Sequence, residues 1–163
     1  MRRSPEWAAC GGDIDGVPNL WVLNPSLWRS GQPTDDGFKN LRAQGIKTVI
    51  NLRNLHSDND EIGTTGLQME RIYFNAFRPD LDEVKRFLSI VRMPERAPFL
   101  VHCLHGSDRT GFMCAVYRVV EQGWPKEDAI EEMIHGSYGH HARLFANLPE
   151  FLWDADLEGL RSR

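Results

Sequence analysis

The sequence predicts a single α/β domain in which a central, mostly parallel β-sheet is flanked by helices. Its length favours one domain, because 163 residues with 41% hydrophobic content are enough for one core and not for two. Short β-branched segments alternate with helical patterns, which is the order that builds a parallel sheet. The joints between these segments are short and rich in Gly and Pro, and no internal repeat is visible.

Two strands are expected at the start of this domain. Residues 1–18 are rich in Gly and Asp and are expected to be irregular, so we place the domain at 19–163. Apolar segments at 20–23 and 27–30 flank Asn24-Pro25 and indicate a hairpin.

A helix and a parallel strand follow the hairpin. Thr34 precedes Asp35 and Asp36, which is typical of a helix N-terminus, and Gly45 ends the helix expected over about 35–44. Residues 46–52 are β-branched and apolar and predict a buried strand.

The middle of the chain predicts a loop, a strand and a helix. Residues 53–66 are polar and indicate a loop with at most one helical turn, and 69–74 indicates a further strand. Asp80 and Glu83 have the spacing of a capping box, which predicts a helix from there to about Val91.

The last part of the chain predicts a strand that leads through a loop into a helix. Residues 99–102 indicate a short central strand, and 109–122 has the buried positions of a core helix that stops at Gly123. Helical segments are also expected over 125–135 and from about 145 to 157.

Composition and charge exclude several functions. The formal net charge is −4, whereas nucleic-acid binders normally present a basic face, so we expect no nucleic-acid partner. No apolar stretch approaches the roughly 20 residues that span a bilayer. The N-terminus has no apolar signal segment, so the cytoplasm is the default location, and export would require a signal removed from the sequence. We expect a monomer.

The segment from His102 to Gly111 carries the predicted chemistry. Cys103 is followed six positions later by Arg109, and the pair lies between a buried strand and a helix, with Gly106 in the loop. Such a loop can wrap its backbone N–H groups around a tetrahedral anion while the helix N-terminus adds partial positive charge. The same field favours the thiolate of Cys103, which is the nucleophilic form. Three cysteines are too few to staple this fold, which also favours a thiol kept for chemistry.

These residues predict a two-step phosphate transfer. Arg109 offers a planar fork to two phosphoryl oxygens, so attack by Cys103 would give a phosphocysteine that water then hydrolyses. Thr110 could hydrogen-bond the sulfur as it leaves. No metal or other cofactor is required, because the loop supplies the positive charge.

The motif H-C-x-x-G-x-x-R-T-G resembles the signature loop of the protein tyrosine and dual-specificity phosphatase superfamily. Residues 28–33 and 48–53 are similar to early segments of its small, atypical dual-specificity branch, and the resemblance covers about 19–155. It implies that Cys103 and Arg109 are catalytic and that the substrate is a phosphoprotein, a small phosphomonoester or a phosphoinositide. Residues expected to contact the phosphate are Leu104, His105, Gly106, Ser107, Thr110 and Gly111.

Several alternatives stay open at this stage. His102, Cys103 and His105 could bind a metal, and so could the histidines at 135, 140 and 141, although neither set has a complete ligand pattern. A phosphate-binding module without turnover and a rhodanese-like sulfur-transfer protein are the rival classes. The loop contains no lysine and carries Asp108, whose charge would repel a polyanion, so phosphotyrosine or mixed phosphoprotein substrates are favoured over inositol phosphates.

The general acid has two candidates. Asp80 lies on the loop before the helix that precedes the catalytic strand, where many members of the superfamily carry this residue, but it also has a structural role as an N-cap. Asp108 lies inside the phosphate loop, where an ionised carboxylate would repel the substrate unless it carried the proton. We favour Asp108.

Overall fold

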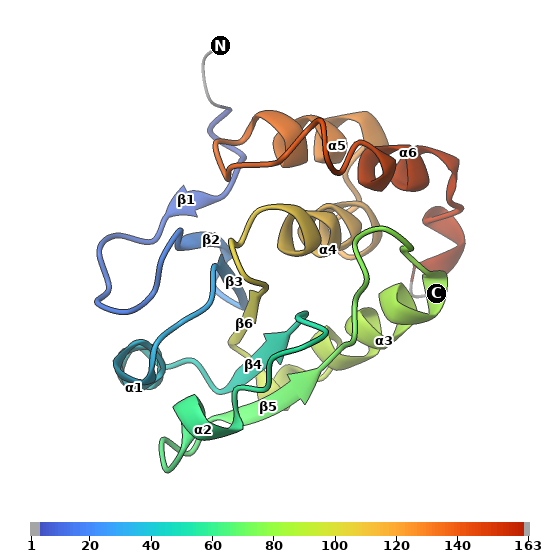
Figure 1. Cartoon of the computed structure of the whole chain (residues 1–163). Helices are drawn as coiled ribbons and strands as arrows, with labels where there is room; N and C mark the ends of the chain where they lie inside the picture. The colour runs from blue at the N-terminus through green and yellow to red at the C-terminus, as the bar shows by residue number, and fades with distance from the viewer. Residues whose placement is uncertain (1–3, 162–163) are drawn as a thin grey trace.

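The computed structural model describes residues 4–161 and confirms the predicted α/β class (Figure 1). Six strands form one sheet in the order β1-β2-β3-β6-β4-β5. The strands are β1 (Ala9–Cys10), β2 (Trp21–Asn24), β3 (Leu27–Ser30), β4 (Thr48–Asn51), β5 (Gln68–Arg71) and β6 (Phe99–His102). The first three pair antiparallel, and β3, β6, β4 and β5 pair parallel, so the sheet as a whole is mostly parallel.

Helices cover both faces of this sheet. They are α1 (Asp35–Ala43), α2 (Asn59–Ile62), α3 (Leu81–Val91), α4 (Asp108–Val120), α5 (Lys126–His135) and α6 (Asn147–Asp154), with short 3₁₀ turns at Pro94–Arg96 and Glu158–Leu160. Figure 1 shows α4 between the sheet and the outer helices α5 and α6, with α1 on the opposite side. None of the helices within residues 4–161 has the length and apolar character that crossing a membrane requires.

Alternation along the strands divides the core into two clusters. Phe99 and Val101 of β6 pack with α3, α4, α5 and α6, whereas Leu100 packs with Phe38 and Leu41 of α1. Successive side chains of a strand point to opposite faces, so one strand supplies both clusters. All four residues of β6 are buried, and the strand lies in the interior of the sheet between β3 and β4.

Two local expectations differ from the structure. Residues 1–18 are not irregular throughout, because Ala9–Cys10 pairs with β2 and Ala8 donates its backbone N–H to the buried Glu132 carboxylate. The predicted capping box forms only in part. Asp80 accepts a hydrogen bond of 2.9 Å from the Asp82 backbone, but within residues 4–161 no hydrogen bond returns from Glu83 to the backbone of Asp80.

Candidate active site

The loop from Cys103 to Ser107 joins the buried end of β6 to the first turn of α4. Cys103 is 2% exposed and Arg109 follows in the first turn of the helix, and both line one cleft of about 360 Å³. The same cleft is lined by Leu104, His105 and Asp108. Local sequence therefore brings most of the predicted site together, because strand, loop and helix are consecutive.

Three consecutive carbonyl groups of the loop are held on its outer side. Leu104 O accepts from the Gln32 backbone at 3.0 Å, His105 O accepts from Asn19 Nδ2 at 3.0 Å, and Gly106 O accepts from Arg29 Nη2 at 2.8 Å. In a planar trans peptide the N–H points opposite to the C=O.

The amides that follow these carbonyls therefore point to the inner side of the loop. They belong to His105, Gly106 and Ser107, and within residues 4–161 none of the three donates to a protein acceptor. Successive amides aimed at one point form an anion-binding concavity, and the N-terminus of α4 adds its partial charge there. The arrangement is suited to a phosphoryl group.

Gly106 is required by the way the loop packs. Its φ is +77°, and a Cβ at this position would lie 2.5 Å from both Gly31 N and Ser30 C. A side chain at residue 106 would push the loop away from the end of β3. The glycine thus lets the phosphate loop approach the backbone that anchors it.

Arg29 anchors the loop from beneath. Its side chain is 1% exposed, and its guanidinium lies 3.8 Å from the centre of the Tyr138 ring while donating to Gly106 O. The sequence around Arg29 resembles the small dual-specificity branch, but no pattern in that segment predicts this contact with the phosphate loop. The Asn19 side chain and the Gln32 backbone were also missed as partners, since no local pattern marks a contact across more than 70 residues.

His102 fixes the backbone of the nucleophile. Its Nδ1 lies 3.1 Å from Cys103 O, and its Nε2 lies 2.5 Å from Asp58 Oδ2, with both side chains fully buried. Burial would raise the pKa of Asp58, but the hydrogen bond and charge of His102 outweigh it and hold that pKa below its usual range. Both ring nitrogens are engaged, which disfavours His102 as a metal ligand beside Cys103.

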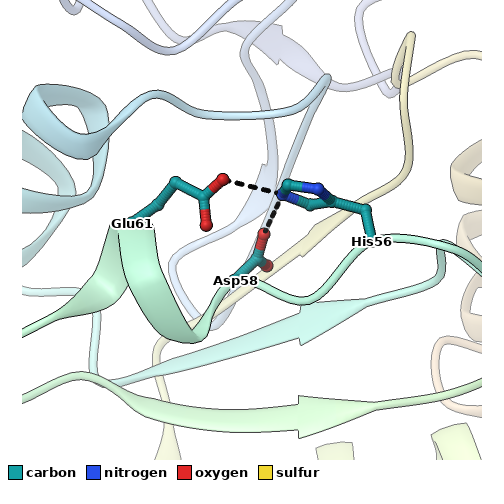
Figure 2. A group of neighbouring side chains, drawn as sticks. All are labelled: His56, Asp58 and Glu61. Atoms are coloured by element: carbon teal, nitrogen blue, oxygen red, sulfur yellow. Dashed lines mark ion pairs between the residues drawn. The ribbon is translucent and has the colours of Figure 1, made fainter.

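A second histidine contacts the same aspartate from the outside. Figure 2 shows His56 facing both Asp58 and Glu61, with His56 Nε2 3.7 Å from Asp58 Oδ1 and 2.8 Å from Glu61 Oε1. These three side chains offer ligand atoms within 4.8 Å of one another, but none of them lines the Cys103 cleft. The two distances are those of ion pairs that His56 makes with Asp58 and with Glu61.

Asp108 is held by two histidines of the loop that follows α5. Its Oδ1 accepts from the His141 backbone at 2.8 Å, its Oδ2 lies 2.5 Å from His141 Nδ1, and His140 Nδ1 lies 2.8 Å from Oδ1. Burial would raise the pKa of Asp108, but the hydrogen bonds from His140 and His141 outweigh it and lower that pKa. The carboxylate is therefore ionised, and His140 and His141 are brought to Asp108 rather than to His135 in a zinc site.

Asp80, the second candidate for the general acid, lies elsewhere. It caps α3 and borders a separate cleft with Phe151 and Asp154, and it is absent from the lining of the Cys103 cleft. Asp108 thus lines the cleft with a lowered pKa, whereas Asp80 lies outside the cleft.

The remaining predicted residues lie around the nucleophile. Arg109 Nη1 donates to Leu52 O at 3.4 Å, and Thr110 is fully buried, with no hydrogen-bond partner for its hydroxyl oxygen among residues 4–161. Ser107 Oγ donates to Tyr138 O at 2.6 Å, so its side chain braces the loop from outside the cleft. Cys114 is core, as expected, and burial raises the pKa of its thiol to about 11.

Fold and site together define a cysteine-based phosphatase. Residues 22–143 match the family model described as a DSP-PTPase phosphatase fused to NAD⁺ kinase. The chain therefore belongs to the dual-specificity type of protein tyrosine phosphatases, and it is a phosphoric monoester hydrolase.

Relatives of known structure agree with this assignment. The chain is 35% identical over 160 residues to the dual specificity protein phosphatase TpbA of Pseudomonas aeruginosa, covering 98% of this chain and 71% of TpbA. A TpbA crystal structure superimposes with a TM-score of 0.86 over 98% of this chain and 97% of that one, and a TpbA variant in complex with pTyr superimposes with a TM-score of 0.85 over 98% and 96%.

The fold is also shared more widely. The catalytic domain of the PP-IP phosphatase Siw14 from S. cerevisiae, at 19% identity, superimposes with a TM-score of 0.78 over 91% of each chain.

Proposed function

We propose that Cys103 is the nucleophile and Arg109 the phosphate clamp of a phosphatase that acts on phosphotyrosine and other phosphorylated side chains of proteins. In the first step Cys103 Sγ attacks phosphorus and the leaving oxygen departs. In the second step water attacks phosphorus and the thiolate leaves. The inward amides of 105–107 and the Arg109 fork stabilise the charge on the phosphoryl oxygens in both steps.

Thr110 and the glycines have supporting roles in this proposal. The Thr110 hydroxyl is buried beside the loop without a protein partner, which suits a donor to the sulfur as it leaves. Gly106 allows the loop to curve, and Gly111 lets α4 pack, since a Cβ there would meet Met133 at 3.4 Å and Arg29 at 3.5 Å.

The residues that line the cleft favour one class of substrate. Around Cys103 the lining is mostly apolar and aromatic, and Arg109 is its only guanidinium or ammonium group among residues 4–161. The apolar lining residues are Phe74, Ala76, Phe77, Leu104, Leu144 and Phe145. Such walls suit a phosphorylated aromatic ring, and one guanidinium suits one phosphoryl group.

A second candidate is an inositol phosphate or phosphoinositide. Siw14 is described as a PP-IP phosphatase and shares the fold. A substrate with several phosphates needs several cations, however, and the Cys103 cleft instead holds the ionised Asp108. The pTyr complex of TpbA, a much closer relative, supports the phosphotyrosine assignment.

Turnover of matched substrates tests this proposal. The wild-type protein should hydrolyse phosphotyrosine peptides with a higher kcat/KM than inositol phosphates or phosphoinositides. Cys103→Ser should lose turnover while keeping vanadate or tungstate binding, because the amides and Arg109 remain. Activity of Cys103→Ser near wild type would refute the phosphocysteine route, whereas a wild-type protein that binds these substrates without hydrolysing them would favour the phosphate-binding module.

Metal dependence gives a separate check. Chelators should leave the rate unchanged, because no step of the proposed route uses a metal. Loss of activity in EDTA with recovery in zinc would instead favour the metal alternative.

We further infer a monomer that acts in a reducing compartment such as the cytoplasm, with residues 19–163 as the phosphatase unit. Cys103 and the other two cysteines are free, and a reactive thiol is best kept reduced. Light scattering after size exclusion and cell fractionation test the two statements.

A further inference from the structure

His141 is placed between the phosphate loop and a buried carboxylate. It lies in the loop after α5 and lines the Cys103 cleft, and its side chain is 47% exposed. Its ring lies 5.4 Å from the His105 ring and 6.4 Å from the Phe145 ring, measured between centroids. The imidazole thus borders the cleft that contains Cys103 and Arg109.

Asp108 orients this imidazole. The Asp108 side chain is 7% exposed, and it contacts both the backbone N–H and the Nδ1 of His141. Because the ionised carboxylate is an acceptor, Nδ1 carries a proton and donates it, which leaves Nε2 as the nitrogen that can exchange a proton. Within residues 4–161, Nε2 of His141 has no hydrogen bond to protein.

The other acidic groups of the described chain do not compete for this task. Asp108 is the only carboxylate that lines the cleft among residues 4–161, and its oxygens are already engaged by histidines. Asp80 borders a different cleft. His105 lines the same cleft but has no carboxylate partner there.

We propose that His141, positioned by Asp108, is the general acid and general base of this phosphatase. The inference rests on the proposed function, since it needs Cys103 as the nucleophile. Asp108 is then a positioning residue, which explains how a carboxylate can lie inside a phosphate loop.

The two steps balance with one proton that shuttles on Nε2. In the first step the S–P bond forms, the P–O bond to the leaving group breaks, and the leaving oxygen takes the proton from Nε2, which leaves neutral imidazole. In the second step neutral Nε2 takes a proton from the attacking water, the new P–O bond forms, and the S–P bond breaks to release the Cys103 thiolate. The sum is hydrolysis of a phosphate monoester to an alcohol and phosphate.

Several charged or titratable groups surround His141. The groups that face it or share its cleft are the Asp108 carboxylate, His140, His105, Arg109 and the Cys103 thiolate. Asp108 is the nearest of these charges, and its contact with Nδ1 orients the imidazole. Histidine changes charge near neutral pH, which suits a group that gives and regains a proton in each turnover.

The leaving group reports whether His141 supplies this proton. His141→Gln should lower kcat for an alkyl phosphate by about 10²- to 10⁴-fold and lower kcat for nitrophenyl phosphate much less, because nitrophenolate leaves without protonation. The basic limb of the kcat–pH curve should disappear. Asp108→Asn keeps an acceptor but removes the charge that holds the imidazole, so its loss of kcat should also be larger for the alkyl phosphate than for nitrophenyl phosphate.

Controls separate catalysis from folding and from the proposed function. His135→Gln changes an exposed histidine at the end of α5 and should match wild type on both substrates. The melting temperature and tungstate affinity of His141→Gln should stay near wild type. Equal loss on both leaving groups, or the leaving-group effect in His105→Gln or Asp80→Asn instead, would overturn the assignment. Full activity of His141→Gln with an inactive Cys103→Ser would overturn only this inference.

Discussion

Gly106→Ala should damage both the stability and the activity of the enzyme. Two separate costs follow from the structure. A φ of +77° costs a residue with a Cβ about 1–2 kcal/mol, and the new methyl group would lie 2.5 Å from backbone atoms of Gly31 and Ser30. Relief of such an overlap by backbone movement typically costs about 1–3 kcal/mol more. We therefore expect a loss of about 2–5 kcal/mol in the free energy of unfolding.

Gly123→Ala is a matched control for the first cost. Its φ is +71°, yet no atom lies within 4 Å of the added Cβ. This variant should lose only about 1–2 kcal/mol and keep its activity, because the glycine lies at the far end of α4 from the loop. Urea unfolding of both variants at one pH measures the difference.

Activity should separate the two variants further. The overlap in Gly106→Ala displaces the amides of the phosphate loop, and a misplacement of about 1 Å can cost roughly 10²-fold in rate. We expect kcat/KM for nitrophenyl phosphate to fall by about that factor in Gly106→Ala alone. A Gly106→Ala enzyme as stable and as active as Gly123→Ala would refute the packing argument.

Two further predictions concern a buried ion pair in the protein core and an aromatic side chain at the rim of the cleft. Glu132 is buried against Arg118 and Tyr138, and although burial would raise its pKa, the hydrogen bond and charge of Arg118 outweigh it and lower that pKa. The stabilisation by the ionised Glu132 carboxylate is thus complete above the unfolded pKa of about 4.3 and is lost as pH falls through the lower folded value. The free energy of unfolding of Glu132→Gln should therefore fall less steeply with decreasing pH than that of the wild type. Near neutral pH the variant should be less stable by about 3–5 kcal/mol. Equal pH slopes for both proteins would contradict this. Phe77 lines the cleft, is 64% exposed and packs against the Phe145 ring. Phe77→Ala should raise KM for a phosphotyrosine peptide by about 2- to 12-fold and leave KM for an alkyl phosphate unchanged. Steady-state kinetics with both substrates measures the difference. An equal rise for both substrates would show that the rim does not read the aromatic ring.

Sequence reasoning succeeded where the determinants are local. Strand β6, the loop after it and helix α4 are consecutive, so spacing and hydrophobic pattern were enough to place Cys103 beside Arg109 at the carboxyl end of a central strand. The cap of α1 is also local, since Thr34 accepts from the Gly37 backbone. A capping pattern cannot show whether the side chain of its second acidic residue accepts from the N-cap backbone. Among residues 4–161, the side chain of Glu83 does not accept from the Asp80 backbone.

Tertiary contacts explain what the sequence could not predict. Asp108 and His141 are 33 positions apart, and only the packing of α5 on α4 brings the loop after α5 to the phosphate loop. Because that contact could not be seen in the sequence, Asp108 was predicted to be a protonated carboxylic acid that serves as the general acid. The anchors of the loop carbonyls, Asn19 and Arg29, were hidden for the same reason.

Trapping of the phosphoenzyme tests the central claim, which is transfer of phosphate to Cys103. The wild-type protein is mixed with a phosphotyrosine peptide, quenched in acid within the first turnover, and digested for mass spectrometry. We predict one phosphoryl group on the peptide that contains Cys103, and none there in Cys103→Ser. Phosphate on another residue, or product released in the first turnover with no phosphate on the enzyme, would contradict the account.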